Sequence, residues 1–276
     1  MTIEPRTEAG RAGLDALLAT PDRALIAFDY DGTLAGIVDD PMDARPGEGM
    51  VERLGELSSR VRLVAVVTGR PAQQAVDLAG FDSAPGLERL VVLGHYGVER
   101  WDAASSSLHT VDPPEGLDRV RATLPDLLAS LDLHDADVED KGLSVAVHVR
   151  RLADPAGAFS SMEGPLGDLA AASGLVAEPG RFVVELRPPG MDKGQALRTL
   201  ADEVGAQAVV FTGDDLGDLP AFDEVARMRG EGSSGLLVCS GSAEVTALAE
   251  RADLVVDGPD GVAGFIDELV AALPPL

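Results

Sequence analysis

Two aspartates, two positions apart, are the residues in this sequence whose spacing most clearly suits chemistry. Asp29 and Asp31 follow an apolar run that is typical of a buried strand, and Gly32 then lets the backbone turn sharply. Side chains two residues apart share one face of an extended backbone, and ligands bind at the carboxyl ends of strands in open α/β sheets. The pair suits phosphoryl chemistry, in which one carboxylate attacks phosphorus, the second donates a proton, and a divalent cation lies between protein and phosphate.

Two other segments offer groups that could hold a phosphate. Thr68 ends a second apolar run, and Pro71 shortly after it suits the start of a helix. The Thr68 hydroxyl and the free amides at that helix start would donate hydrogen bonds to phosphate oxygens. Lys193 lies in the first turn of another predicted helix, after Asp192 as its N-cap. Because a cation there opposes the helix dipole, phosphate neutralisation explains Lys193 better than helix stability does.

A fourth segment crowds carboxylates around a glycine turn. Asp214, Asp215 and Asp218 follow the predicted strand 207–212. Their mutual repulsion would be costly unless a cation is present, and ligation by oxygen atoms with room for water favours Mg²⁺. Taken singly, each of the four segments has a structural explanation, such as helix capping or a solvated loop. Their joint placement at successive strand ends favours a phosphoryl-transfer site.

The chain of 276 residues is strongly acidic, with 47 acidic and 22 basic residues and a formal net charge of −25. Such a charge repels nucleic acids and anionic membrane surfaces, so neither is an expected partner. It also repels a phosphorylated substrate, which means that a phosphate site needs a metal ion and a few well-placed cations. We interpret most of the acidic side chains as solvated surface.

The single cysteine, Cys239, lies in an apolar run, so the chain cannot form an intramolecular disulfide and a reducing compartment is expected. The amino terminus lacks the basic and then apolar pattern of a signal peptide. No apolar stretch approaches the ~18 residues expected of a membrane span. These features predict a soluble, cytoplasmic protein.

Short apolar runs alternate with helical patterns in both halves of the chain, which predicts an α/β fold with a Rossmann-like, doubly wound parallel sheet. The predicted core strands are 24–29, 62–67, 89–94, 207–212, 235–240 and 253–257. The rhythm breaks after Trp101, where turns and a hairpin near 176–186 indicate an α+β insertion. We therefore expect residues 1–101 and 190–276 to form the core and residues 102–189 to form an inserted domain.

The four segments together resemble the motifs of the haloacid dehalogenase (HAD) superfamily of aspartate-nucleophile phosphatases. In order, the matching residues are Asp29-Tyr30-Asp31-Gly32-Thr33-Leu34, Thr68-Gly69-Arg70, Lys193-Gly194, and Gly213-Asp214-Asp215 with Asp218. The resemblance implies that the insertion is a mobile cap of the C2 type. It also implies that Asp29 attacks the phosphorus to give an aspartyl phosphate, and that Asp31 protonates the leaving oxygen and then activates water.

The same resemblance implies how the phosphoryl group and a cofactor are held. Thr68 and Lys193 would bind the transferring phosphoryl group, with Mg²⁺ beside it. The residues expected at the Mg²⁺ site are Asp29, Asp31 through its backbone carbonyl, and Asp214, with Asp215 and Asp218 close by.

Three further segments resemble the trehalose-6-phosphate phosphatase family within that superfamily. They are residues 93–99, residues 139–150, and Glu185-Leu186-Arg187-Pro188 leading into Lys193-Gly194. The resemblance extends over most of the chain and implies hydrolysis of trehalose 6-phosphate in trehalose biosynthesis, with functional coupling to a trehalose-6-phosphate synthase. One departure concerns the first segment, because Tyr96 stands where the family commonly has a histidine.

The resemblance also implies a set of substrate contacts, which are Arg70, Tyr96, Gly97, Lys141, His148, Arg150 and Glu185. Another explanation is open in the insertion, because alternating His148 and Arg150 could line a solvated sheet face and Lys141 follows an acidic run. Two other functions also stay open: a phosphatase for sucrose phosphate or mannosylglycerate phosphate, and a non-catalytic module that senses a sugar phosphate. The complete set of core motifs favours an enzyme over such a module.

Overall fold

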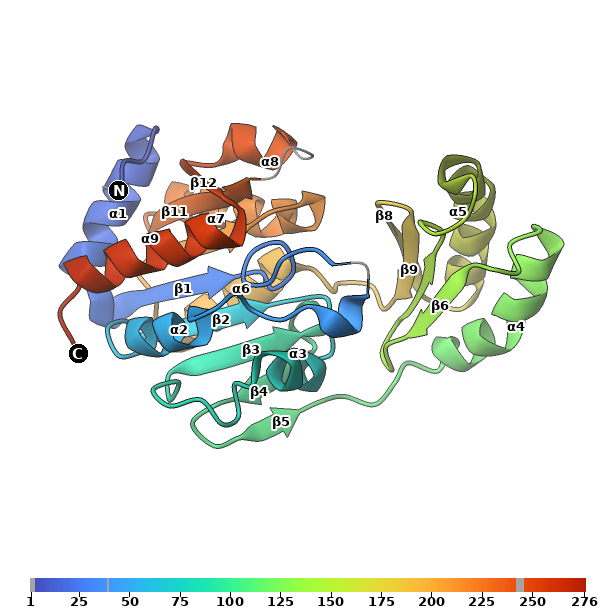
Figure 1. The fold of residues 1–276 in the computed structure, drawn as a ribbon, viewed down its shortest axis with the longest axis horizontal. Coiled ribbons are helices and arrows are strands. Elements are labelled where there is room, and N and C mark those ends of the chain that lie inside the picture. The colour runs from blue at the N-terminus through green and yellow to red at the C-terminus, as the bar shows by residue number, and fades with distance from the viewer. Residues whose placement is uncertain (1–2, 39, 242–245) are drawn as a thin grey trace. The chain divides into compact units, whose positions relative to one another are not determined.

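The structure, a computed structural model, describes residues 3–38, 40–241 and 246–276. The chain divides into two compact units, one formed by residues up to Thr110 together with Asp192–Leu276 and the other by Val111–Met191 (Figure 1). We call them the core unit and the inserted unit. No helix within the described ranges is both long and apolar enough to cross a membrane.

In its described residues, the core unit is built on an eight-stranded sheet with the order β12-β11-β10-β1-β2-β3-β4-β5. Its strands are β1 (Ala24–Phe28), β2 (Leu63–Val67), β3 (Leu90–Gly94), β4 (Glu99–Asp102), β5 (Ser107–His109), β10 (Ala208–Gly213), β11 (Ser234–Gly241) and β12 (Leu254–Asp257). From β12 to β3 all neighbours are parallel, whereas β4 and β5 add an antiparallel edge. The chain order reverses beside β1, and open α/β sheets bind ligands at such a point.

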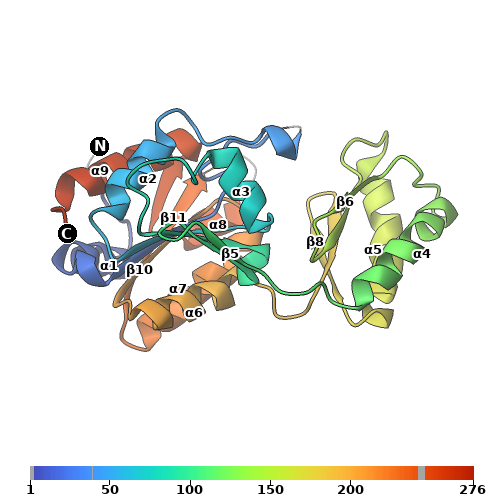
Figure 2. The same ribbon diagram turned by 90° about the horizontal axis from the view of Figure 1, so that it is seen from below.

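Helices cover both faces of this sheet because β1 is apolar on both of its faces. Ile26 and Phe28 pack into one buried cluster, and Leu25 and Ala27 pack into the other. The first cluster takes residues from α1 (Glu8–Ala19), α2 (Met50–Ser58), α3 (Ala72–Ala79) and α9 (Gly258–Ala272), and the second from α6 (Lys193–Val204), α7 (Leu219–Gly230) and α8 (Thr246–Arg251). Figure 2 shows α2 and α9 on the opposite side of the sheet from α6 and α7. Burial on both faces explains why the parallel strands read as continuous apolar runs.

The inserted unit has a four-stranded antiparallel sheet with the order β6-β7-β9-β8. Its elements are α4 (Gly116–Ser130), β6 (Asp137–Asp140), β7 (Val145–His148), α5 (Pro155–Ala172), β8 (Val176–Gly180) and β9 (Val183–Arg187). Both helices pack on one face of the sheet, against side chains such as Val145, Val147 and Val184. Because neighbouring strand residues point to opposite faces, Ala146, Glu185 and their cross-strand neighbours lie on the other face.

The α/β class and the doubly wound parallel sheet predicted from the sequence are confirmed. The division of the chain differs in detail, since β5 pairs with β4 and keeps residues up to Thr110 in the core unit. The strands β4 and β6 were not predicted either. β5 has three residues and β6 has three acidic residues in four, so pairing with a neighbouring strand, rather than local propensity, makes them strands.

Candidate active site

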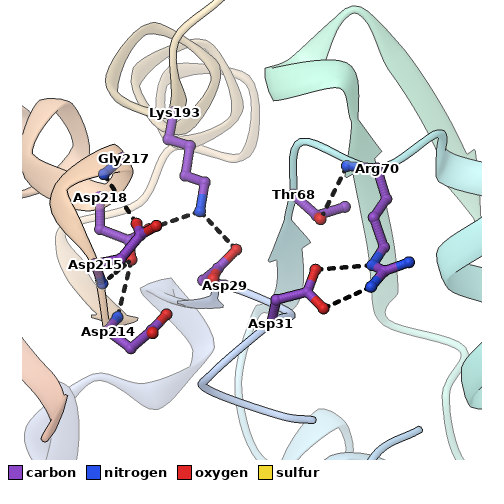
Figure 3. A network of polar contacts seen from close by, with 9 residues as sticks. All are labelled: Asp29, Asp31, Thr68, Arg70, Lys193, Asp214, Asp215, Gly217 and Asp218. Carbon is purple, nitrogen blue, oxygen red and sulfur yellow. Dashed lines mark hydrogen bonds and ion pairs between the residues drawn. The ribbon is translucent and has the colours of Figure 1, made fainter. Parts of the chain in front are cut away.

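Asp29 lies directly after β1, where the strand order reverses, and its carboxylate faces Lys193 (Figure 3). The Lys193 ammonium donates hydrogen bonds to Asp29 Oδ1 at 2.5 Å and to Asp218 Oδ1 at 2.7 Å. Lys193 is the first residue of α6, which Asp192 caps by accepting a hydrogen bond from the amide of Gln195. Lys193 and both of its carboxylate partners are buried, so water screens this bridge very little.

The turn after β10 is held by its own carboxylates. Asp218 Oδ2 accepts hydrogen bonds from the amides of Asp214 at 2.9 Å and Asp215 at 3.2 Å. Asp215 in turn accepts one from the amide of Gly217, which completes a capping box. A Cβ added to Gly213 would lie 2.3 Å from Asp218 Cγ, so glycine is required there. Asp218 therefore shapes the turn that presents Asp214.

Three buried carboxylates form a group with the donor atoms that a divalent cation requires. One oxygen each from Asp29, Asp214 and Asp218 lies within 4.8 Å of the other two. Gly32 permits this approach, because a Cβ on this residue, whose φ is +78°, would lie 2.1 Å from a carboxylate oxygen of Asp214. Donors that are all oxygen suit hard cations, so these residues fit the Mg²⁺ expected from the sequence.

The surplus of negative charge in this group changes the pKa values of its members. Burial raises the pKa of Asp29 well above its usual value, and repulsion from Asp218 adds to the effect, although Lys193 opposes it. Burial also raises the pKa of Asp214 to about 8, together with repulsion from Asp218. Burial by itself would lower the pKa of Lys193, but the charges of Asp218 and Asp29 hold it well above its usual value. The lysine stays charged, and a divalent cation would allow the carboxylates to ionise together.

The loop after β2 carries Thr68 and Arg70. Thr68 is buried, and its hydroxyl accepts a hydrogen bond from the Arg70 amide at 3.1 Å, just before α3 begins. The Arg70 guanidinium donates from Nε and Nη2 to the two carboxylate oxygens of Asp31, both at 2.7 Å (Figure 3). Asp29 and Asp31, expected to share one face, are thus held by different cations. The contact between Arg70 and substrate stays a prediction, while its contact with Asp31 is shown by the structure.

Tyr96 lies in a strained loop after β3 that packs against Thr68. His95 and Tyr96 have φ values of 47° and 57°, which non-glycine residues seldom adopt. The Tyr96 amide donates a hydrogen bond to the Thr68 carbonyl at 2.9 Å, and a Cβ on Gly69 would lie 2.6 Å from the Tyr96 hydroxyl. Gly97, at φ +98°, lies against α6, where a Cβ would meet a neighbour at 2.5 Å. The loop brings Tyr96 to the predicted phosphate loop, and its contact with a sugar stays a prediction.

Ser240, at the end of β11, is a residue of this region that sequence reasoning missed. Its hydroxyl is buried and donates a hydrogen bond to the Gly32 carbonyl at 2.7 Å, which holds the turn between Asp31 and the following residues. The signal available in the sequence was a polar residue closing the apolar run of a predicted core strand.

In the inserted unit, the structure brings together two of the predicted substrate contacts. The Lys141 ammonium donates a hydrogen bond to Glu185 Oε1 at 3.3 Å, and the Ser144 hydroxyl donates to the same oxygen at 2.5 Å. Glu185 and Ser144 are both buried. Ser144 was not predicted as a site residue, although it is the polar residue next to the alternating strand that carries His148.

The other two predicted contacts of the inserted unit do not join this group. His148 Nε2 lies 3.1 Å from Glu139 Oε2, so its partner is a residue of β6 that sequence reasoning missed. Arg150 is exposed after β7. Arg187, two residues further along β9 than Glu185, donates a hydrogen bond to Glu178 at 3.0 Å. Of the alternating residues, Ser144 and Ala146 are therefore buried, His148 is half-buried in a contact with β6, and Arg150 beyond the strand is exposed.

Comparison with known proteins shows which family the sequence matches. The sequence model of the family described as trehalose-phosphatase matches residues 27–256. Trehalose-phosphate phosphatase from Mycobacterium marinum is 32% identical over 268 residues, which cover 93% of this chain and 64% of that protein. An uncharacterized glycosyl hydrolase from Mycobacterium tuberculosis is 35% identical over 227 residues, or 78% of this chain and 16% of that protein. The chain thus spans part of the length of these relatives.

Solved structures share the fold at lower identity. The C-terminal domain of a trehalose-6-phosphate phosphatase from Candida albicans has a TM-score of 0.77 at 20% identity and covers 99% of both chains. A haloacid dehalogenase-like hydrolase from Bacteroides thetaiotaomicron has a TM-score of 0.62 at 16% identity, covering 89% of this chain and 99% of its own. Both likenesses agree with the α/β class of the core unit.

Proposed function

The chain belongs to the trehalose-phosphatase family, and we propose that it hydrolyses trehalose 6-phosphate to trehalose and inorganic phosphate. The observation that carries this proposal is the buried bridge in which Lys193 contacts Asp29 and Asp218. Phosphoryl transfer to an aspartate needs a carboxylate nucleophile, a cation on the phosphoryl oxygens and a metal-binding group, and the core unit holds candidates for all three.

In the first half of the proposed reaction, Asp29 is the nucleophile. A carboxylate oxygen of Asp29 bonds to phosphorus while the bond between phosphorus and the sugar oxygen breaks, leaving its electron pair on that oxygen. Asp31 donates a proton to the sugar oxygen, so trehalose leaves and an aspartyl phosphate remains on Asp29. Lys193 and Thr68 hold oxygens of the transferring group, because charge spreads over these oxygens in the transition state.

In the second half, water attacks the phosphorus of the aspartyl phosphate. The water gives a proton to Asp31 as the bond between phosphorus and Asp29 breaks, and phosphate is released. This step returns Asp31 to its protonated form and Asp29 to its ionised form, so the two carboxylates are ready for another substrate.

Mg²⁺ is the cofactor in this proposal, held by the carboxylates of Asp29 and Asp214 and by the backbone carbonyl of Asp31. Bound there, Mg²⁺ would supply positive charge that offsets the negative charge on the phosphoryl oxygens. Asp215 and Asp218 support the site from the capping turn, since hydrogen bonds from amides and from Lys193 already engage Asp218.

The inserted unit, predicted as residues 102–189, would act as a cap that recognises the sugar. Lys141 and Glu185, with the Ser144 hydroxyl beside them, can both donate and accept hydrogen bonds, which suits the hydroxyls of a disaccharide. We assign His148, Arg150, Tyr96 and Gly97 to further contacts with the substrate. In trehalose biosynthesis the substrate would come from a trehalose-6-phosphate synthase, to which this reaction would be coupled.

Phosphate release across a panel of sugar phosphates tests the proposal. Purified protein with Mg²⁺ should release phosphate from trehalose 6-phosphate far faster than from sucrose phosphate or mannosylglycerate phosphate, and a chelator should stop the release. A faster reaction with either of the other sugar phosphates would contradict the proposed substrate. Binding of trehalose 6-phosphate without any phosphate release would indicate a sensing module instead.

A further inference from the structure

Arg70 holds Asp31 by a two-pronged contact to which the reaction scheme gives no role. Arg70 Nε and Nη2 donate to Asp31 Oδ2 and Oδ1, both at 2.7 Å. The side chain of Arg70 is 10% exposed and that of Asp31 is 36% exposed, so the arginine is the more enclosed partner. Parallel hydrogen bonds between a guanidinium and a carboxylate fix the orientation of the carboxylate as well as its distance.

The guanidinium of Arg70 is itself fixed from two sides. Its central carbon lies 5.5 Å from the centroid of the Tyr30 ring, and Tyr30 is buried with its hydroxyl donating to the Ala44 carbonyl at 3.1 Å. The Arg70 amide donates to the Thr68 hydroxyl, and the Arg70 carbonyl accepts from the His95 amide. Arg70 therefore links the predicted phosphate loop to the side chain of Asp31 through a set of short contacts.

Asp29 and Asp31 need different surroundings because they do different work in the proposed reaction. Asp29 belongs to the buried oxygen group that suits a cation, whereas Asp31, within the described residues, is not a member of that group (Figure 3). Asp31 lies on the turn after β1, so its carboxylate is close to Lys193 and to the cation-binding group. If Asp31 turned to either of them, its carboxylate would leave the orientation in which Arg70 holds it.

We propose that Arg70 is a positioning residue for Asp31. It holds the Asp31 carboxylate apart from the group around Asp29, in the orientation from which Asp31 acts on the leaving oxygen. Arg70 thereby determines how well a leaving group that needs a proton is expelled, and it affects turnover through Asp31. The inference rests on the proposed function, because the proton transfer by Asp31 is part of that proposal.

Two substrates separate this positioning role from a merely structural one. A sugar leaves as an alkoxide that needs a proton, whereas p-nitrophenyl phosphate releases a stable phenolate that does not. Arg70→Met removes the guanidinium but keeps an unbranched apolar side chain against Tyr30. We expect it to lower the rate of sugar release in the first turnover of trehalose 6-phosphate by ~10- to 100-fold, with the half-saturating concentration within about twofold. The first-turnover rate of p-nitrophenolate release should change by less than about threefold. The first turnover isolates this step, because the later attack of water uses Asp31 with either substrate.

Two further variants serve as matched comparisons. Arg70→Lys keeps the charge but cannot form the two-pronged contact, so it should retain most of the defect. Arg100, on β4 of the same unit, makes a comparable two-pronged contact with Asp102, with Nη2 to Oδ1 at 2.9 Å and Nε to Oδ2 at 3.0 Å. Arg100→Met should leave kcat for both substrates unchanged, which controls for the loss of such a contact in general.

The double variant Arg70→Met with Asp31→Asn asks whether Arg70 acts through Asp31. If it does, the double variant should be no slower with trehalose 6-phosphate than Asp31→Asn alone, within about twofold. Losses that multiply in the double variant would overturn the proposal.

Other outcomes also decide the question. Equal losses of the first-turnover rate with both substrates would overturn the proposal in favour of a structural role, and a higher half-saturating concentration with an unchanged maximal rate would make Arg70 a substrate ligand. If the wild-type protein prefers another sugar phosphate, the proposed substrate is wrong, and the same comparison with that sugar phosphate still decides the role of Arg70. A wild-type protein that hydrolyses no phosphate ester would overturn the proposed function itself.

Discussion

The core unit and the inserted unit each place a lysine against a buried carboxylate, but the two sites differ in their balance of charge. In the core unit, Lys193 contacts two carboxylates, including that of Asp29, and a third lies in the same buried group. In the inserted unit, Lys141 contacts Glu185, and the hydroxyl of Ser144 donates to the same oxygen. One site has a surplus of negative charge, whereas at the other a contact joins the Lys141 ammonium to the Glu185 carboxylate.

The difference in charge matches a difference in chemistry. Several buried carboxylates around one lysine repel one another, so this site is suited to receive a divalent cation and, with it, a phosphate. A balanced pair with a hydroxyl beside it has no such need, and it can exchange hydrogen bonds with uncharged sugar hydroxyls. The charge balance around the lysine, rather than the lysine itself, separates a site for phosphoryl transfer from a site for recognition.

Replacing the nucleophile should abolish turnover, because the chemical step takes place in the core unit and not at the site around Lys141. We expect Asp29→Asn to lower kcat for trehalose 6-phosphate by about 10⁴-fold or more, because no aspartyl phosphate can form. The unfolding midpoint should stay near that of the wild type, since a neutral amide replaces a carboxylate that burial disfavours. Phosphate release and thermal unfolding measure both effects, with the exposed Asp22→Asn as the control. Turnover close to that of the wild type would refute the assignment.

Removal of divalent cations should affect the core unit alone. A chelator should lower turnover by ~10³-fold, and added Mg²⁺ should restore it, because the carboxylate surplus needs a cation. Calorimetry should show Mg²⁺ binding at wild-type affinity in Lys141→Met and weaker binding in Asp214→Asn. Equal Mg²⁺ affinities in these two variants would argue against the metal group described for the core unit.

The affinity for Mg²⁺ should depend on pH because the pKa of Asp214 is raised to about 8 in the ion-free protein. Below that pH the carboxyl is protonated and Mg²⁺ must displace the proton, so affinity should rise by up to about tenfold per pH unit until pH ~8. The folded protein then holds a proton that the unfolded chain has lost, so the free energy of unfolding without Mg²⁺ should fall as pH rises through this window.

Calorimetric titrations at pH 6 and pH 8, in buffers of different ionisation enthalpy, would measure the affinity and the protons released. An affinity that is the same at both pH values, with no proton release, would show that the cluster is already ionised without the cation.

Changes in the inserted unit should give smaller effects that depend on the substrate. We expect Glu185→Gln or Lys141→Met to raise KM for trehalose 6-phosphate by about tenfold, which corresponds to ~1.4 kcal/mol of binding free energy. The kinetics with p-nitrophenyl phosphate should stay the same, because that substrate has no sugar hydroxyls. The exposed His134→Gln is a control in the same unit. A loss of kcat with both substrates would show that the pair does more than recognise the sugar.

The sequence predicted where the site lies better than it predicted which residues pair. Apolar runs located β1, β2 and β10, and the polar residues that follow them do meet beside the point where the strand order reverses. The pairing of Arg70 with Asp31 was not predicted, because the two residues are 39 positions apart in the sequence. The sequence also does not show whether Arg70 or Lys193 is the cation that contacts Asp31. The contact between Lys141 and Glu185 spans 44 positions and depends on how β7 and β9 pair.

The strands missed from the sequence have a related explanation. β4, β5 and β6 are three or four residues long and mostly polar, so no periodic pattern marks them, and they form because a neighbouring strand offers hydrogen bonds. Hydrophobic periodicity therefore predicted the buried parallel strands and missed these short polar strands, one of which sets the boundary between the two units.

Phosphorylation of Asp29 during turnover tests the central claim most directly. Wild-type protein with Mg²⁺ and trehalose 6-phosphate can be quenched in acid within a single turnover and digested for mass spectrometry of its peptides. We expect a phosphoryl group on Asp29 that hydroxylamine removes. No other carboxylate should carry a phosphoryl group, in the wild type or in the Asp31→Asn variant. Rapid phosphate release with no phosphoryl group on Asp29, or with the group on another residue, would contradict the account.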